Sequence, residues 1–212
     1  MKFGLVPVNV GVKSVDHIIG ISQLAESVGM ESVWTFEHVI VPEDYASKYP
    51  YSADGKMGAR PDTNFVDPLI ALTAVAANTK TLKLGTGVNI VSQANPLLLA
   101  KQAASLDFVS GGRFMLGAGI GWLREEFDAM GVPFERRGAR FDDYMVCLLY
   151  NSDAADDLPR VDPGGRRSIN KHTKLECYHS VHPSPALQIP ATSLTRHISP
   201  EHITVLGDAV SD

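Results

Sequence analysis

Four short apolar segments, each followed by a segment with helical periodicity, constrain the fold of this chain more than any other feature of its sequence. Apolar runs of this length suit strands that are buried on both faces, and no hairpin turn separates them. Because neighbouring parallel strands need a crossover connection, this alternation predicts an α/β fold with a parallel sheet. We expect strands at 3–8, 32–35, 82–88 and 113–116, and helices at 14–28, 67–78, 95–110, 123–130 and 137–145.

Residues with capping chemistry mark the ends of the expected helices. Ser14 can accept a backbone hydrogen bond at the start of the first helix, and Gly29 can end that helix in a left-handed conformation. Asp67 and Asn95 each precede a proline, which suits the first turn of a helix because it has no N–H to leave unpaired. Two architectures satisfy this pattern, a doubly wound sheet and a (β/α)₈ barrel. In both, ligands bind at the carboxyl ends of the strands, so the loops after the second, third and fourth strands are the most informative.

Composition excludes several classes of function. The net charge of −5 argues against a nucleic-acid-binding surface, which needs clustered lysine and arginine. No apolar run approaches the roughly 20 residues of a membrane span, and the N-terminus lacks a signal-peptide pattern, so we expect a cytoplasmic protein that acts on a small molecule. Cys147 and Cys177 stand in no metal or redox spacing. The grouping of Cys177, His179 and His182 lacks a fourth ligand, and we predict no metal site.

The composition changes near residue 146. Both tryptophans lie before this point, while both cysteines and five of the seven histidines lie after it. Beyond it the sequence sustains neither a strand period nor a helix period. The segment from Cys147 resembles translated sequencing-adapter DNA or a frameshift joined to a coding fragment. We therefore predict two parts: residues 1–146, which carry the strand–helix units, and residues 147–212, an irregular non-native tail. A divergent, loop-rich C-terminal extension is the alternative.

Glycines follow the third and fourth expected strands. The string GAGIGW at 117–122 is close to a dinucleotide-binding fingerprint, but Trp122 occupies the third glycine position and the string follows the fourth strand rather than the first. Its remaining role is close approach of the backbone to a flat ligand, because glycine has no Cβ. A plain strand-to-helix turn is the alternative. The glycines of 85–87 indicate a bulge or a close backbone approach, or simple packing inside a barrel.

Glu37 and His38 directly follow the second strand. A histidine at this position can move a proton or bind a carbonyl near neutral pH, although a single histidine after a strand is commonly a structural hydrogen-bonding group. The loop that follows has about 30 residues and includes Tyr45, Tyr49 and Tyr51. Loops of this length inside a compact domain are usually functional or disordered. The tyrosines favour a packed substrate lid, and a solvated insertion is the alternative.

Taken together, these motifs resemble the luciferase-like monooxygenase superfamily, the family of bacterial luciferase, and are most similar to its branch that uses the deazaflavin coenzyme F420. No segment after Val146 takes part in the resemblance. The matching strings are SVW and EHV at 32–39, PEDY at 42–45, YPYS at 49–52, DP at 67–68, LGTGV at 84–88, NP and AKQAASLD at 95–107, SGGRFMLG at 110–117, GIGWLREE at 119–126, and GVPF and RG at 131–138.

The resemblance implies a partial (β/α)₈ TIM barrel, made of the first four βα units, with a flavin-like ring at the carboxyl ends of its strands. It implies a non-prolyl cis peptide between Gly87 and Val88, against which the ring leans. His38 would lie near the reacting carbon and move a proton as hydride passes between the ring and the substrate, and Glu37 would orient His38 or polarise the substrate. The residues expected to contact the ring are Thr86, Gly87, Val88, Asn89, Gly119, Ile120 and Gly121.

The activity implied by the resemblance is that of an F420-dependent oxidoreductase whose parent enzyme is a homodimer. An FMN-dependent monooxygenase that consumes oxygen is the alternative within the family, and a non-catalytic cofactor-binding protein is the alternative outside enzymes. Four further βα units, whose loops hold most of the cofactor phosphate contacts in this family, are not found in the sequence. We therefore expect this chain by itself to be an inactive fragment that binds cofactor poorly, with open sheet edges that reduce its solubility.

Overall fold

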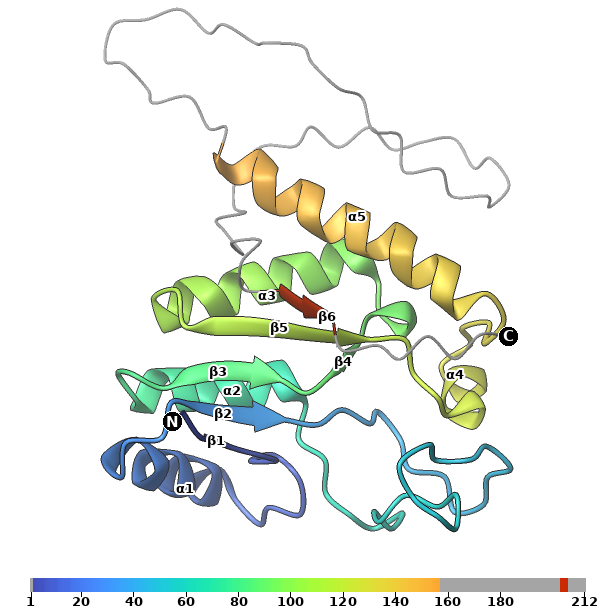
Figure 1. Ribbon diagram of the computed structural model, residues 1–212, viewed down its shortest axis with the longest axis horizontal. Coiled ribbons are helices and arrows are strands. Elements are labelled where there is room, and N and C mark those ends of the chain that lie inside the picture. The colour runs from blue at the N-terminus through green and yellow to red at the C-terminus, as the bar shows by residue number, and fades with distance from the viewer. Residues whose placement is uncertain (1, 157–202, 206–212) are drawn as a thin grey trace, which may run out of the picture.

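The computed structural model describes residues 2–156 and 203–205. Strands and helices alternate along the chain in the predicted order, and the strands run side by side in one direction (Figure 1). The elements are β1 (Gly4–Leu5), α1 (Val15–Ser27), β2 (Ser32–Thr35), α2 (Pro68–Asn78), β3 (Lys83–Thr86), β4 (Asn89–Ile90), a 3₁₀ turn (Val91–Gln93), α3 (Pro96–Ser110), β5 (Phe114–Gly119), α4 (Arg124–Ala129), α5 (Arg137–Asp156) and β6 (Ile203–Val205).

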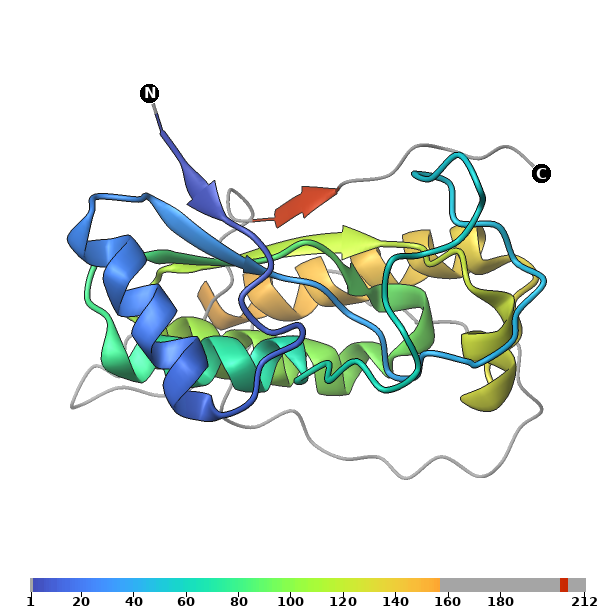
Figure 2. The ribbon, with the colours of Figure 1, turned by 90° about the horizontal axis from the view of Figure 1, so that it is seen from below.

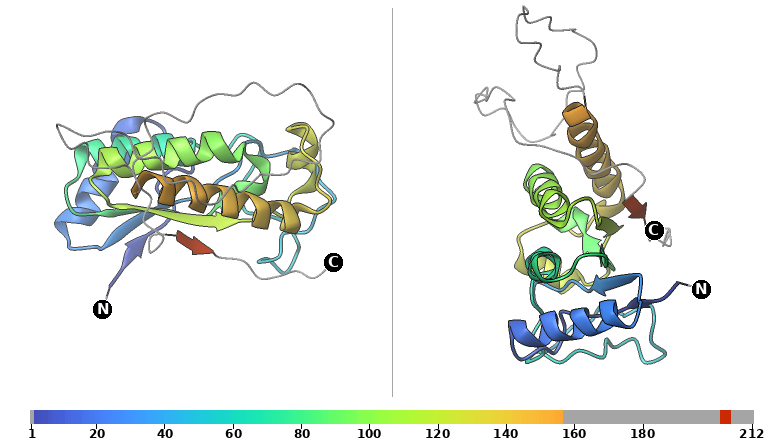
Figure 3. Two further views of the ribbon diagram at one scale, coloured as in Figure 1. Left: turned by 90° about the horizontal axis from the view of Figure 1, so that it is seen from above. Right: turned by 90° about the vertical axis from the view of Figure 1, so that its left-hand side faces the viewer.

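The sheet is parallel throughout the described residues, with the order β1-β2-β3-β5-β4, and β6 also pairs with β5. Figure 2 shows the strands in one layer and helices α1, α2, α3 and α5 in another, and the second view in Figure 3 shows the same separation of strands from helices. A doubly wound sheet carries helices on both faces, whereas a barrel carries them only on its outside. The predicted α/β fold is confirmed, and the one-sided helix layer fits part of a (β/α)₈ barrel.

The register of the sheet sorts side chains onto its two faces. Paired residues of neighbouring parallel strands point to the same side, and Val33, Leu84 and Phe114 form one such row. All three are fully buried, and they form the core together with the apolar faces of the helices. The next row, Trp34 and Gly85, faces the other side of the sheet. The core therefore lies between the sheet and the helices.

The capping residues act as the sequence predicts. Ser14 accepts a hydrogen bond from the backbone N–H of His17, and Asp67 accepts one from Ile70. Asn95 Oδ1 accepts from both N–H groups that follow the proline of α3. These bonds satisfy backbone donors that have no partner inside the helix. They fix where each helix leaves the carboxyl edge of the sheet.

The strand expected at 82–88 ends at Thr86 as β3, and a second strand, β4, begins at Asn89, beyond the expected range. The chain leaves the strand path at a cis peptide bond between Gly87 and Val88, the position that the resemblance implies. At this break, the hydroxyl of Thr86 donates to the carbonyl of Gly117 at 2.8 Å and accepts from the N–H of Gly117 at 2.9 Å. Asn89 then resumes the pairing, beside a later residue of β5. At the bulge, the hydroxyl of Thr86 therefore takes the place of the main-chain hydrogen bonds that join β3 to β5 elsewhere.

A single tryptophan packs across two strands on the face of the sheet away from the core. The indole of Trp34 lies where a side chain on Gly85 would be, since a Cβ built there would come within 2.3 Å of the indole ring. A Cβ on Gly4 would come within 2.9 Å of the indole nitrogen. That nitrogen donates to the hydroxyl of Ser32 at 2.9 Å. The close approach of the indole therefore requires glycine on both neighbouring strands.

The C-terminal part of the chain differs from expectation in two places. Helix α5 begins at Arg137 as predicted but continues through Asp156, past the boundary expected at residue 146. Strand β6 lies within the segment predicted to be irregular and pairs with β5. The division into two parts stays a prediction, and Cys177, His179 and His182 lie outside the described residues. No helix in 2–156 is both long and apolar enough to cross a membrane.

The contact between Gly117 and Thr86 gives a test of the bulge. A Cβ on Gly117 would lie 2.0 Å from the carbonyl oxygen of Thr86, so β3 and β5 would have to separate. We expect Gly117→Ala to lower the free energy of unfolding by roughly 1–3 kcal/mol, the usual cost of overpacking. Urea unfolding followed by circular dichroism measures this change.

Gly20→Ala is the matched control. Gly20 lies on the exposed side of α1, and a Cβ there meets nothing within 4 Å. Because alanine favours the helix, this variant should gain up to about 1 kcal/mol. A Gly117→Ala protein as stable as the wild type would contradict the tight contact.

Candidate functional site

Three loops meet at the carboxyl edge of the sheet, toward which the arrowheads of β2, β3 and β5 all point in Figure 1. The loop after β2 carries Glu37 and His38, and each contacts a different neighbouring loop. Glu37 binds the backbone N–H of Ile90, which follows the bulge. His38 lies 3.1 Å from Glu126, which follows β5. The structure thus brings together the three turns that the sequence singles out.

Glu37 is held against the bulge and not against His38. One carboxyl oxygen accepts from the Ile90 N–H, and the other accepts from Asn89 Nδ2 at 3.1 Å. Burial raises the pKa of Glu37 to about 7, the hydrogen bond from Ile90 opposes the shift, and the negative charges of Asp67 and Glu126 add to it. Glu37 therefore exchanges its proton near neutral pH. The expected contact that orients His38 comes from Glu126 instead.

His38 is fixed by a carboxylate and by two aromatic rings. Its Nδ1 lies 3.1 Å from Glu126 Oε2, and the side chain of Glu126 is only 2% exposed. Phe65 and Trp122 stand edge-on to the imidazole, with ring centres 5.5 and 6.1 Å away. The imidazole is itself 15% exposed. It can therefore present its second nitrogen to a ligand while the first stays bound.

The residues expected to contact a ring divide into two groups by exposure. Gly87, Val88, Ile120 and Gly121 are partly exposed at the edge of the sheet. Their backbone can be approached, and a flat ligand can lie against it. The buried group is Thr86, Asn89 and Gly119.

Each buried residue of this set has a contact within the protein. The hydroxyl of Thr86 is used by Gly117. A Cβ on Gly119 would lie 2.5 Å from the side chain of Val88, so this glycine makes room for the bulge. Asn89 differs, because its Oδ1 is buried and has no hydrogen-bond partner among the described residues. A buried acceptor without a partner is costly, and a donor on a bound ligand would satisfy it.

The long loop after β2 is packed at Tyr45 and Tyr49, whereas Tyr51 is 75% exposed. Trp122 is the centre of its aromatic contacts, with ring centres 5.9 Å from Tyr45 and 5.1 Å from Tyr49. Glu125 accepts from the backbone N–H groups of Ala46 and Ser47 at 2.7 and 3.2 Å. These contacts tie part of the loop to α4 and its preceding turn, and its role as a substrate lid stays a prediction.

The sequence reasoning missed Glu125 and Glu126. Both lie in the matching string GIGWLREE, but carboxylates on a short helix usually face solvent. Their partners lie 79 and 88 residues earlier in the chain, in Ala46 and His38. No local sequence pattern predicts contacts between residues so far apart in the chain. The one available signal was the resemblance, which aligned the string without assigning it a role.

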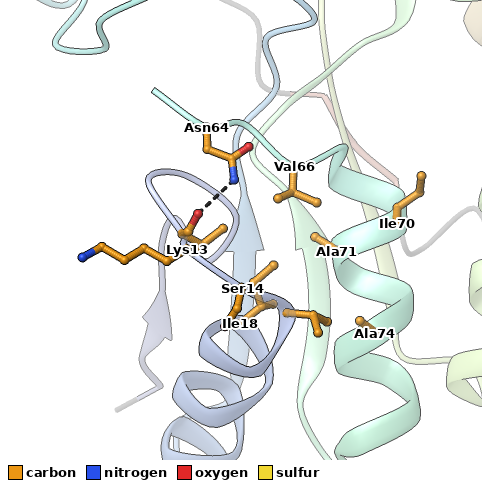
Figure 4. Close-up of a pocket in the computed structure, with 10 residues that line it drawn as sticks. Lys13, Ser14, Ile18, Asn64, Val66, Ile70, Ala71 and Ala74 are labelled. Atoms are coloured by element: carbon orange, nitrogen blue, oxygen red, sulfur yellow. Dashed lines mark hydrogen bonds between the residues drawn. The ribbon is translucent and has the colours of Figure 1, made fainter. Parts of the chain in front are cut away.

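An apolar pocket lies elsewhere, between the start of α1 and the first turns of α2 (Figure 4). Ile18, Val66 and Ala71 line it, and Asn64 closes one side by donating to the Val12 carbonyl at 2.9 Å. It shares no residue with the carboxyl-edge site and offers no pair of ionisable groups. The candidate active site is therefore the carboxyl edge and not this pocket.

Comparisons with known proteins identify the family of this chain. A model of the luciferase-like monooxygenase family matches residues 2–149. An uncharacterized protein of Mycobacterium tuberculosis is 33% identical over 130 residues, which are 60% of this chain and 45% of that protein. The 5,10-methylenetetrahydromethanopterin reductase of Methanolobus tindarius is 34% identical over 115 residues, which are 54% of this chain and 28% of that enzyme.

Among solved structures, monooxygenase RslO1 from Streptomyces bottropensis is similar with 30% identity and a TM-score of 0.53. The similarity covers 71% of this chain and 43% of RslO1. The chain thus spans about half the length of the curated relatives it matches first.

The raised pKa of Glu37 predicts how stability depends on pH. The folded protein holds this proton more tightly than the unfolded chain, so the contribution of Glu37 is full below the ordinary pKa of 4.5 and is lost as pH rises through about 7. We expect the Tm of the wild type to fall more between about pH 5 and about pH 8 than that of Glu37→Gln, which cannot ionise. Glu43→Gln, a change at an exposed glutamate in the same loop, should keep the wild-type dependence. Equal slopes for wild type and Glu37→Gln would contradict the prediction.

Proposed function

This chain belongs to the luciferase-like monooxygenase family, and we propose that it carries the ring-binding half of an oxidoreductase that moves a hydride between coenzyme F420 and a small organic substrate. The proposal depends on one observation: His38, the bulge at Gly87–Val88 and Trp122 meet at the carboxyl edge of one parallel sheet. Parallel α/β folds bind their ligands at this edge.

The residues at this edge fit a planar ring with a polar rim. Gly87, Val88 and Gly121 offer partly exposed backbone without bulky side chains in the way. The buried Oδ1 of Asn89 can accept a hydrogen bond from an N–H group on the rim of a ring. When bound, F420 supplies the carbon that accepts or donates the hydride.

His38 is the group we assign to proton transfer. Its Nδ1 is engaged by Glu126, which leaves Nε2 for a hydroxyl or carbonyl of the substrate. Hydride transfer to or from an alcohol or an iminium carbon changes the charge at the neighbouring atom, and a positioned histidine can balance that change near neutral pH. Trp122 and the loop around Tyr45 exclude water from this point.

The choice between reduction and oxygenation rests on the relatives. The 34% identical enzyme from Methanolobus tindarius is named a reductase, which supports hydride transfer to an organic substrate. RslO1, 30% identical, is named a monooxygenase, and it supports an FMN-dependent monooxygenase as the second candidate. We favour F420 because the sequence most resembles the branch that uses this coenzyme.

A titration with each cofactor tests the proposal. Purified chain is titrated separately with F420 and with FMN, and the absorbance and fluorescence of each ring are followed. We expect weak, saturable binding of F420 and weaker binding of FMN, because the family match ends at residue 149 and the phosphate contacts of the family are expected in its second half. Preferential binding of FMN would favour the monooxygenase. A folded chain that perturbs neither ring would contradict the ring site.

Replacing His38 tests the proton-transfer role. In the full-length parent enzyme, His38→Ala should lower kcat by about 10²–10⁴-fold, the usual contribution of a general acid or base. The dissociation constant of the cofactor should stay largely unchanged, because the bulge and its backbone are intact. His17→Ala, a change at an exposed histidine on α1, is the control. Unchanged turnover in His38→Ala would remove this residue from the mechanism.

A further inference from the structure

Glu126 is not the group assigned to transfer the proton, yet its side chain is among the most buried polar groups of the described residues. It is 2% exposed and comes from α4, a helix of six residues. Burying a carboxylate is costly unless hydrogen bonds compensate it. The groups that form hydrogen bonds with the buried Glu126 carboxylate therefore indicate the role of this side chain.

Two backbone N–H groups and one imidazole nitrogen of the loop after β2 surround this carboxylate. Oε1 accepts from the backbone N–H of Val39 at 2.6 Å and, more weakly, from that of Ile40 at 3.4 Å. Oε2 faces His38 Nδ1 at 3.1 Å. A backbone N–H can only donate, so Oε1 must act as an acceptor. The backbone contacts thereby fix which oxygen is turned toward the imidazole.

The tautomer of His38 follows from this arrangement. Neutral imidazole carries its proton on one nitrogen and a lone pair on the other. An ionised carboxylate can only accept, so the nitrogen that faces it must carry the proton. Phe65 and Trp122 stand at 88° and 86° to the imidazole plane and hinder rotation of the ring.

We infer that Glu126 is a positioning residue that holds His38 as the Nδ1–H tautomer, with the lone pair of Nε2 turned toward the site. The inference deepens the proposed function and rests on it for the use of that lone pair. A proton taken up at Nε2 leaves an imidazolium next to the Glu126 carboxylate, which stabilises the positive charge. The tautomer itself is a property of the folded chain and needs no cofactor.

The neighbouring residues Glu125 and Glu126 make a matched pair for the test. Both are carboxylates on α4 that accept backbone N–H groups of the same loop, but only Glu126 faces His38. In Glu126→Gln, the single amide oxygen can replace Oε1 toward Val39, and the NH₂ group then points at the imidazole. An NH₂ donor requires a lone pair on Nδ1, so the proton must move to Nε2.

The experiment reads the tautomer by long-range ¹H–¹⁵N NMR of the imidazole, on the chain without cofactor, at a pH where the ring is neutral. The His38 signals are assigned by their loss in His38→Gln. We expect the Nδ1–H form in the wild type and in Glu125→Gln, and the Nε2–H form in Glu126→Gln. Dispersed backbone amide spectra establish that each variant is folded.

Two results would overturn the inference: a wild type that already carries the proton on Nε2, or a folded Glu126→Gln that keeps it on Nδ1. If Glu126→Gln does not fold, the wild-type spectrum decides by itself, since only the Nδ1–H form supports the inference. The outcome is independent of the cofactor titration. A chain that binds neither F420 nor FMN but shows the expected tautomers would lose the proposed function and keep the role of Glu126.

Discussion

The hydroxyl of Thr86 holds the sheet together at the point where β3 ends and β4 begins. There the main chain turns aside at Gly87–Val88, and the hydroxyl both donates to and accepts from Gly117 on β5. Because this pair keeps β3 on β5, the pairing can resume at Asn89 in a fixed register. The amide of Ile90 that binds Glu37 is placed by the same register. Two of the three loops of the candidate site thus depend on one side chain inside the sheet.

Two glutamates at this edge show how the same side chain takes different roles in different surroundings. Glu37 has two donors, from Ile90 and Asn89, and its burial raises its pKa to about 7. Glu126 is more buried but receives Val39, Ile40 and His38, so a negative charge there is compensated from several directions. The first is suited to exchange a proton, and the second is suited to hold a neighbour in place.

The sequence predicts the fold well because its signals are local. Alternating apolar segments fix the parallel sheet, and Ser14, Asp67 and Asn95 mark helix starts through bonds to residues two or three positions away. The glycines of LGTGV indicate a bulge in this segment, but the cis peptide at Gly87–Val88 was placed only by the resemblance. The contact between His38 and Glu126 joins residues 88 positions apart, so it becomes visible only when the sheet is assembled.

Helix α5 extends past the expected boundary because the residues that follow it continue the buried apolar side of the helix. The residues after 146 begin with Cys147-Leu148, which are buried against the rest of the chain, so the apolar side of the helix does not stop at the expected boundary. A change in composition therefore did not coincide with the end of a secondary-structure element.

The indole of Trp34 lies across β1 and β3 and fills the space that side chains at positions 4 and 85 would need. Gly4 and Gly85 are small because Trp34 is large, and Ser32 supplies the one polar contact of the indole. In homologous sequences, the side-chain volumes at positions 4, 34 and 85 should therefore vary together. A smaller residue at 34 would be accompanied by a residue larger than glycine at 4 or 85. Such coupled variation would show that this family can change which strand supplies the side chains inside its barrel while the strand pairing stays the same.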